Sequence, residues 1–126
     1  MKRLGIACLL SVFLIFLCLF GTYMSETVSA RISEKIQTIS QTMDKGDFAL
    51  AQEASQQLQK EWEGYHTILC TFLCHKELEG MDEHLAALPW YLKNGEKGLA
   101  EATCAQIEDA MKHLKETEEL RLENIL

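Results

Sequence analysis

The sequence predicts an all-α protein, in which an N-terminal transmembrane helix is followed by a small helical-hairpin bundle of about four helices. Three observations support this prediction. An apolar segment without charged residues occupies residues 4–24. In the rest of the chain, apolar residues recur at the three- and four-residue steps of helix faces, and the strict alternation typical of half-buried strands is absent. The 126 residues also include a single proline, Pro89.

The N-terminal segment has the composition of a signal anchor. Lys2 and Arg3 precede the apolar run of about 21 residues, and a helix needs about 20 residues to span a bilayer. Basic residues before a first span hold the N-terminus in the cytoplasm. The chain therefore divides into an anchor, residues 1–24, and an extracytoplasmic acidic helical domain, residues 25–126. The alternative is secretion after cleavage near Ala30, which ends a small-residue Val-Ser-Ala sequence.

The charge distribution excludes one large class of partners. Two of the 12 basic residues precede the apolar segment, whereas all 19 acidic residues follow it. A domain with this acidic excess repels nucleic acid and anionic headgroups, so we expect no nucleic-acid binding.

Two turn signals divide the domain into helical hairpins. "DKGD" (44–47) and "KNGE" (93–96) each contain a glycine suited to the left-handed position after a helix and an acidic residue suited to cap the next one. A shift of 49 residues places Gly46 on Gly95, although any two amphipathic hairpins could align comparably. We expect the first helix to continue from the anchor to about Met43. Two such hairpins would form a small bundle or a pair resembling tetratricopeptide repeats.

The break between the hairpins has two candidates, Gly64 and Gly80. Each glycine costs about 1 kcal/mol in a helix interior, but the apolar phase continues through both. Gly64 is favoured because helices over 65–93 and 96–125 would then match in length.

Cysteine and histidine residues around the middle of the chain could carry chemistry. On one continuous helix, Cys70 and Cys74 would extend the stripe that begins at Leu78, and a buried thiol behaves as a small hydrophobe. A disulfide from Cys104 to either of them is the second interpretation. Zinc is the third, with His66 joining Cys70 and Cys74 in a column, but no second ligand pair on another element is evident.

His75 lies beside this stripe and has Glu79 four residues later. A histidine at the boundary of the core, held by that carboxylate, is the simpler interpretation. The other interpretation is a proton-sensitive contact to a partner. The weak metal candidates are therefore His66, Cys70, Cys74 and His75, and no catalytic motif or cofactor fingerprint is recognisable.

The overall layout resembles a known family. Its features here are a basic start, one span, Trp62, "H-x-E" at His75 and Glu77, a Gly-acidic turn, and the ending Glu-Asn-Ile-Leu over 123–126. The chain is similar to a family of small single-pass proteins of spore-forming Gram-positive bacteria, domain of unknown function family 4363. The resemblance implies an extracytoplasmic helical domain and pairing with a small multispan membrane protein. It supplies no catalytic residues.

The sequence therefore leads to a non-enzymatic, membrane-anchored accessory partner of another membrane protein, held in the membrane by residues 4–24. The expected contact residues are His75, Glu77, Glu79, Leu122, Ile125 and Leu126. The alternative function is an envelope thiol or metal sensor using Cys70, Cys74, Cys104 and His75. Self-association through the apolar stripes remains an open alternative.

Overall fold

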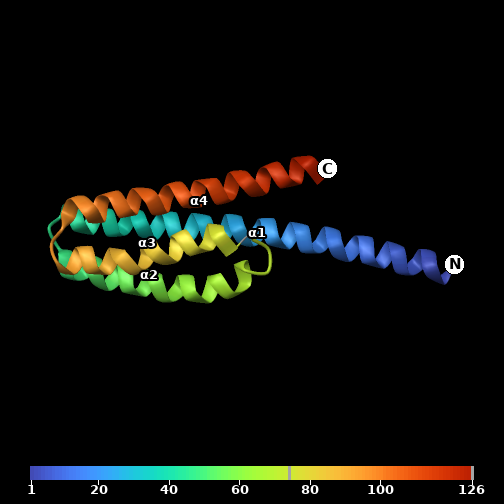
Figure 1. The fold of residues 1–126 in the computed structure, drawn as a ribbon, viewed down its shortest axis with the longest axis horizontal. Helices are drawn as coiled ribbons and strands as arrows, with labels where there is room; N and C mark the ends of the chain where they lie inside the picture. The colour runs from blue at the N-terminus through green and yellow to red at the C-terminus, as the bar shows by residue number, and fades with distance from the viewer. Residues whose placement is uncertain (74, 126) are drawn as a thin grey trace.

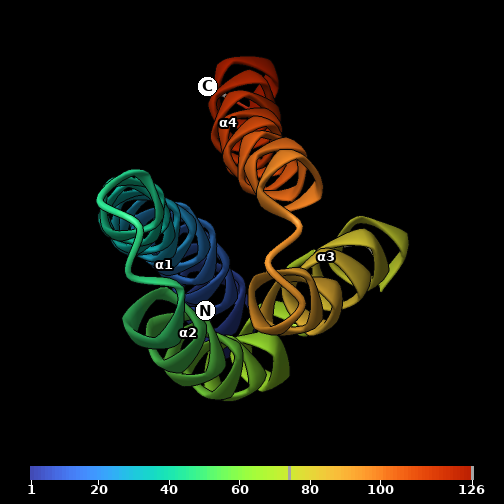
Figure 2. The same ribbon diagram turned by 90° about the vertical axis from the view of Figure 1, so that its left-hand side faces the viewer.

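A computed structural model describes residues 1–73 and 75–125, without the side chains of Glu118, Arg121, Leu122 and Ile125. The described residues form four helices and no strand, as the sequence predicts. The helices are α1 (Lys2–Asp44), α2 (Phe48–Leu69), α3 (His75–Lys93) and α4 (Lys97–Ile125). They run alternately up and down, and each packs on two neighbours in the ring order α1, α2, α3, α4 (Figures 1 and 2). Because α4 packs on α1, the ring is closed into a four-helix bundle.

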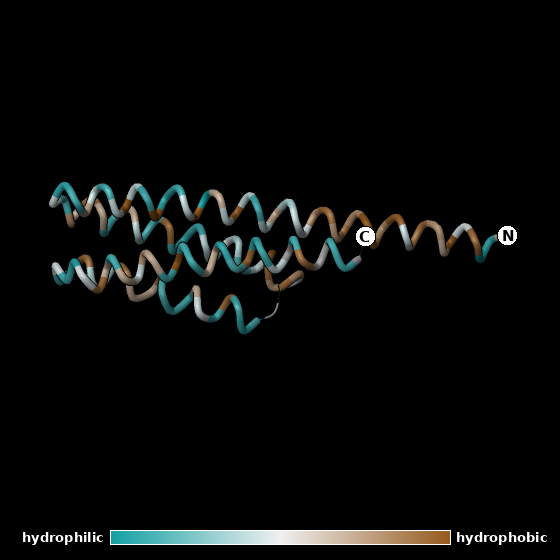
Figure 3. The backbone as a smooth tube through the Cα atoms, turned by 90° about the horizontal axis from the view of Figure 1, so that it is seen from above, coloured by the Kyte–Doolittle hydropathy of each residue, from teal (hydrophilic) through white to brown (hydrophobic). Residues whose placement is uncertain are grey.

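The first helix has two parts with opposite surroundings. Residues 4–20, here called the stem, project from the bundle (Figures 1 and 3). Their apolar side chains are almost all exposed. From Gly21 onward the same helix buries one face. The helix runs through this change without interruption and ends at Asp44, close to the expected Met43. In length and composition it can span a membrane, a test that a signal sequence would also pass.

The core follows the four apolar stripes of the sequence. It is one cluster of buried side chains with spacing typical of helix faces. Its members are Val28, Ile32, Ile36, Ile39, Met43, Ala51, Leu58, Trp62, Leu69, Leu73, Leu78, Met81, Leu85, Leu88, Leu92, Ala100, Cys104, Ile107, Met111 and Leu114.

The far end of the bundle, opposite the stem, contains two matching turns. Gly46 and Gly95 have positive φ angles of 83° and 68°. In the first turn Gly46 N donates to Met43 O and Asp47 N to Thr42 O, and the second turn repeats this pattern 49 residues later. This is the Schellman arrangement, which satisfies the last carbonyls of a helix. The proposed repeat is therefore visible in the backbone, and the Asp47 side chain caps α2 by accepting from Leu50 N.

The break between the hairpins lies at neither expected glycine. Gly64 is inside α2 and Gly80 inside α3, and the chain reverses between Leu69 and His75. The expectation of equal lengths for helices 65–93 and 96–125 was wrong, because α3 has 19 residues and α4 has 29. The stripe of α2 packs on both sides of Gly64, through Trp62 and Leu69, and this packing offsets the propensity cost of the glycine.

Candidate functional site

The connection between α2 and α3 closes the stem end of the bundle. Helix α2 ends with Thr71 N, Phe72 N and Leu73 N donating to carbonyls of Ile68 and Leu69. Leu69 and Leu73 are buried beneath this turn. The Phe72 ring packs 5.9 Å from the Phe20 ring, centroid to centroid. The connection therefore lies against the point where the stem enters the bundle.

A glycine of α1 makes this contact close. A Cβ atom placed on Gly21 would lie 3.2 Å from Cδ1 of Phe72, tighter than ordinary van der Waals contact. A hydrogen at this position therefore lets the Phe72 ring approach the α1 backbone.

Three side chains of the types that can ligate metals come together at this end, from α2, the residue after it and the start of α3. The ligand atoms of His66, Cys70 and His75 all lie within 4.8 Å of one another. Cys70 Sγ is 3.7 Å from both ring nitrogens of His66, and the His66 and His75 ring centroids are 6.2 Å apart. His66 is half-buried, whereas Cys70 and His75 are exposed. The cluster is therefore reachable from solvent.

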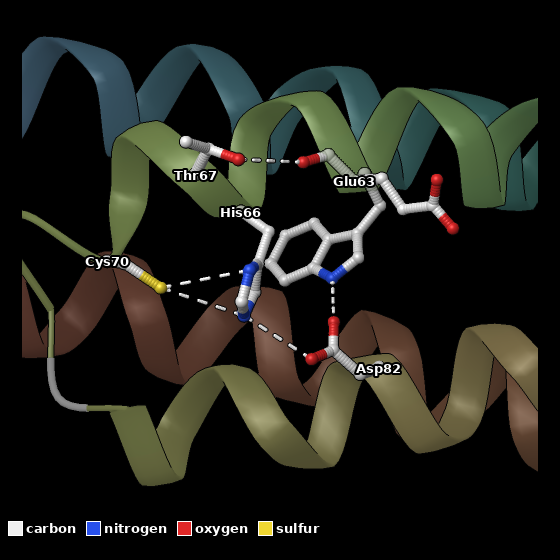
Figure 4. A network of polar contacts seen from close by, with 6 residues as sticks. Glu63, His66, Thr67, Cys70 and Asp82 are labelled. Carbon is white, nitrogen blue, oxygen red and sulfur yellow. Dashed lines mark hydrogen bonds and ion pairs between the residues drawn. The ribbon is translucent and has the colours of Figure 1, made fainter.

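A buried tryptophan and an aspartate support His66. Trp62 is 1% exposed, and its Nε1 donates to Asp82 Oδ1 at 2.5 Å. The second carboxylate oxygen of Asp82 lies 3.3 Å from His66 Nε2. Figure 4 shows His66 between Cys70 on one side and Asp82 on the other. The chain Trp62, Asp82, His66 thus fixes the imidazole by contacts from both α2 and α3.

The interpretation of Cys70 as a core residue was wrong. It assumed one helix through residues 70–78, but α2 ends at Leu69 and Cys70 is exposed. The apolar residues around it close the end of the core as a turn. Cys74 lies outside the described residues, so its predicted packing and its disulfide to Cys104 have no structural account.

Cys104 lies apart from the cluster. It is a free, buried cysteine on α4, beside Ser40 of α1 and near the far end of the bundle. Burial raises the pKa of its thiol. Cys70 is also free, so these two do not form the alternative disulfide, and the four-residue sensor set is not assembled in one place.

The expected pairing of His75 with Glu79 is absent from the described contacts. His75 instead faces His66, and no ion pair joins it to Glu79 within the described part of the chain. Glu77 lines a groove between α3 and α4, above the buried side chains of Leu78, Met81, Met111 and Leu114.

The C-terminal contact candidates are only partly described. The backbone of α4 continues past the α2–α3 connection towards the stem (Figure 1). The side chains of Leu122 and Ile125, and all of Leu126, lie outside the described residues. In the same stretch Leu120 is 59% exposed, and Glu119 and Glu123 are also exposed.

An ion-pair cluster links α1 to α2. The Glu61 carboxylate contacts Lys35 and Arg31, and hydrogen bonding to Lys35 is the largest cause that lowers the pKa of Glu61. The cluster is partly exposed, so it contributes little stability and mainly orients α2 relative to α1.

Sequence reasoning identified His66, Cys70 and His75 only as weak candidates and missed Asp82. Trp62, which donates to Asp82, is 20 residues earlier in the chain and on another helix. No local spacing could indicate this contact, because only the hairpin geometry joins the two positions.

A family model described as "Domain of unknown function (DUF4363)" matches residues 19–125. No curated protein and no solved structure matches the chain.

Proposed function

Because the chain belongs to the DUF4363 family, whose description assigns no activity, we propose a function from its geometry. The protein is a single-pass membrane protein whose extracytoplasmic bundle docks, without catalysis, on another membrane protein. Its stem crosses the bilayer, and the bundle lies directly at the outer surface.

The observation that carries this proposal is the continuity of α1. One helix of 43 residues contains both the exposed apolar stem and the first wall of the bundle. Leu9 is 72% and Phe16 61% exposed, so this surface needs an apolar environment such as lipid. A continuous helix also holds the bundle at a fixed height and orientation above the membrane.

The position of Ala30 favours an uncleaved anchor. Ala30 lies inside α1, next to the buried Ser29, whose Oγ donates to Met111 O of α4 at 3.0 Å. Cleavage at this position would remove Val28 and Ser29 from the core. Lys2 and Arg3 favour a cytoplasmic N-terminus.

The end of α4 supplies the argument for a protein partner. Helices α1 and α4 are antiparallel, and Ser29 contacts Met111. With the same rise per residue in both helices, Glu119 and Glu123 of α4 lie near the level of residues 21 and 17 of α1. Carboxylates at that level cannot face the hydrocarbon without a large cost. A neighbouring membrane protein with polar or basic groups beside the stem would accommodate them.

Site-specific crosslinking in native membranes tests this docking. A photoreactive amino acid at Leu120, in the α4 extension, should yield one crosslinked species with a membrane protein. Leu50 is the matched control, because it is a leucine of similar exposure, 53%, near the far end of the bundle. Equal crosslinking from both positions, or none from Leu120, would contradict the proposed surface.

Deletion of residues 122–126 tests the C-terminal contact separately. We expect the deletion to weaken co-purification with the partner, since it removes Leu122, Ile125 and Leu126 while leaving the core residues in place. Unchanged co-purification would place the contact elsewhere on the bundle.

The second candidate function is an envelope metal or thiol sensor. It is favoured by one observation, the convergence of His66, Cys70 and His75 at the stem end. Cys104 does not take part in it.

A further inference from the structure

We propose that His66, Cys70 and His75 form a binding site for Zn²⁺ at the stem end of the bundle. This site is independent of the docking proposal, because it concerns metal binding by the chain alone and needs no partner.

The types of ligand favour zinc. One thiolate and two imidazoles form the mixed sulfur and nitrogen set that borderline-soft Zn²⁺ prefers, while Mg²⁺ and Ca²⁺ need oxygen ligands. Binding replaces the proton on Cys70 Sγ, which leaves to solvent.

The distances require only a small adjustment. Tetrahedral zinc with bonds of about 2.0–2.3 Å places its ligand atoms roughly 3.3–3.8 Å apart. Cys70 Sγ and the His66 ring nitrogens are already 3.7 Å apart. All three ligand atoms lie within 4.8 Å, so rotation of the exposed Cys70 and His75 side chains closes the set.

The contact with Asp82 determines which nitrogen of His66 is available. Asp82 Oδ2 lies 3.3 Å from Nε2, so Nε2 faces a carboxylate and Nδ1 is the nitrogen left to face the metal. Metal-ligating histidines usually donate their second ring N–H to a carboxylate or carbonyl group in this way. Trp62 Nε1 holds the other oxygen of Asp82. Asp82 is therefore a positioning residue.

The ligands come from both sides of the α2–α3 connection. His66 lies within α2 and Cys70 directly follows it, whereas His75 begins α3. The reversal of the chain therefore supplies His75 as a ligand from a second helix. One continuous helix through these residues would not supply a ligand from a second helix. A bound ion would tie together the two ends of the connection whose Phe72 packs on Phe20 and Gly21.

The exposure of the site indicates exchangeable binding. Three protein ligands leave one tetrahedral position for water, as in open zinc sites. Cys70 and His75 are both exposed, so the ion can enter and leave without unfolding the bundle.

The experiment uses the full chain in detergent, purified without a polyhistidine tag. The test variant has Cys70 as its sole thiol, through serine substitution of Cys8, Cys18, Cys74 and Cys104. The matched control keeps only Cys104, which is buried near the far end. Titration with Co²⁺ gives a thiolate-to-cobalt charge-transfer band only where a cysteine binds the ion, and Zn²⁺ then displaces it.

We expect one ion per chain and a charge-transfer band in the Cys70 variant, with neither in the Cys104 control. His75→Ala should weaken binding at least about tenfold, and Asp82→Asn about 10–100-fold. His113→Ala should change nothing, because His113 is exposed on α4 and pairs with Asp109 instead. Helicity by circular dichroism should stay constant in all these variants.

Two results would overturn the proposal. One is the absence of stoichiometric binding to the Cys70 variant. The other is binding that His75→Ala and Asp82→Asn leave intact, which would identify an adventitious surface ion.

Discussion

The two ends of the bundle are closed by different means. At the far end, two turns with left-handed glycines and identical backbone hydrogen bonds reverse the chain. At the stem end, a connection without glycine reverses it, with Leu73 buried beneath the turn and Phe72 packed against α1. Local backbone chemistry closes the first end, and contacts between distant residues close the second.

This difference explains where chemistry can gather. The glycine turns satisfy their own backbone groups, and the side-chain contacts there include the Asp47 cap and the ion pair between Lys97 and Asp44. The stem end brings the termini of α2 and α3 together with the stem, so His66, His75 and Asp82 from two helices meet there. The comparison predicts different consequences of mutation at the two ends.

The largest effect should come from the aromatic core of the stem end. Trp62→Ala should lower the free energy of unfolding by about 3–5 kcal/mol, because it removes a buried indole and leaves a cavity. Trp90→Ala is the matched control, since Trp90 is 64% exposed and should change stability by less than about 1 kcal/mol. Chemical unfolding of the full chain in detergent, followed by circular dichroism, measures both. Similar losses of unfolding free energy in the two variants would contradict the assignment of Trp62 to the core.

The glycines should separate the two ends by the sign of the effect. Gly46→Ala and Gly95→Ala should each cost about 1–2 kcal/mol, because an alanine side chain is strained at positive φ. Gly64→Ala and Gly80→Ala should stabilise by about 0.5–1 kcal/mol, because both sites are helical with open space around the added methyl group. The same unfolding measurement applies. A cost at Gly64 comparable to that at Gly46 would reinstate a break at Gly64.

The smallest effect should come from the ion-pair cluster between the ends. The pKa of Glu61 is lowered in the folded protein, so its ion pairs stabilise the fold fully when the pH is above the ordinary pKa of 4.5. This stabilisation disappears as the pH falls through the lower pKa of the folded state. Glu61→Gln should therefore cost less than about 1 kcal/mol at pH 7 and almost nothing near pH 2. Glu53→Gln is the control, because Glu53 is exposed and makes no ion pair with any other residue that the structure describes. If Glu61→Gln lowers the free energy of unfolding equally at both pH values, the packing of the side chain, and not its charge, is responsible for the stabilisation.

Much of the fold could be predicted from the sequence because its causes are local or periodic. The stripes of α1 and α3, the turns at Gly46 and Gly95, and the apolar stem all follow from helix period, glycine conformation and hydropathy. The end of α2 could not be predicted, since residues 68–74 are apolar on nearly all sides and fit either a buried helix or a packed turn. Errors about Cys70 and the Gly64 break share this origin.

The candidate site was predictable only as a set of residue types. His66 and Cys70 share a helix face at a four-residue spacing, which the sequence contains. His75 joins them only because the chain reverses, and Asp82 reaches His66 only because α3 packs on α2.

The sequence by itself determined an all-helical chain with an apolar N-terminal segment, two hairpins and a far end closed by glycine turns. These features depend on contacts within a few residues, where helix period and backbone conformation dominate. Only the tertiary structure decided that α4 closes the ring on α1 and that the stem end gathers His66, Cys70, His75 and Asp82. Those outcomes depend on packing between helices remote in the chain, for which sequence spacing contains no distance information.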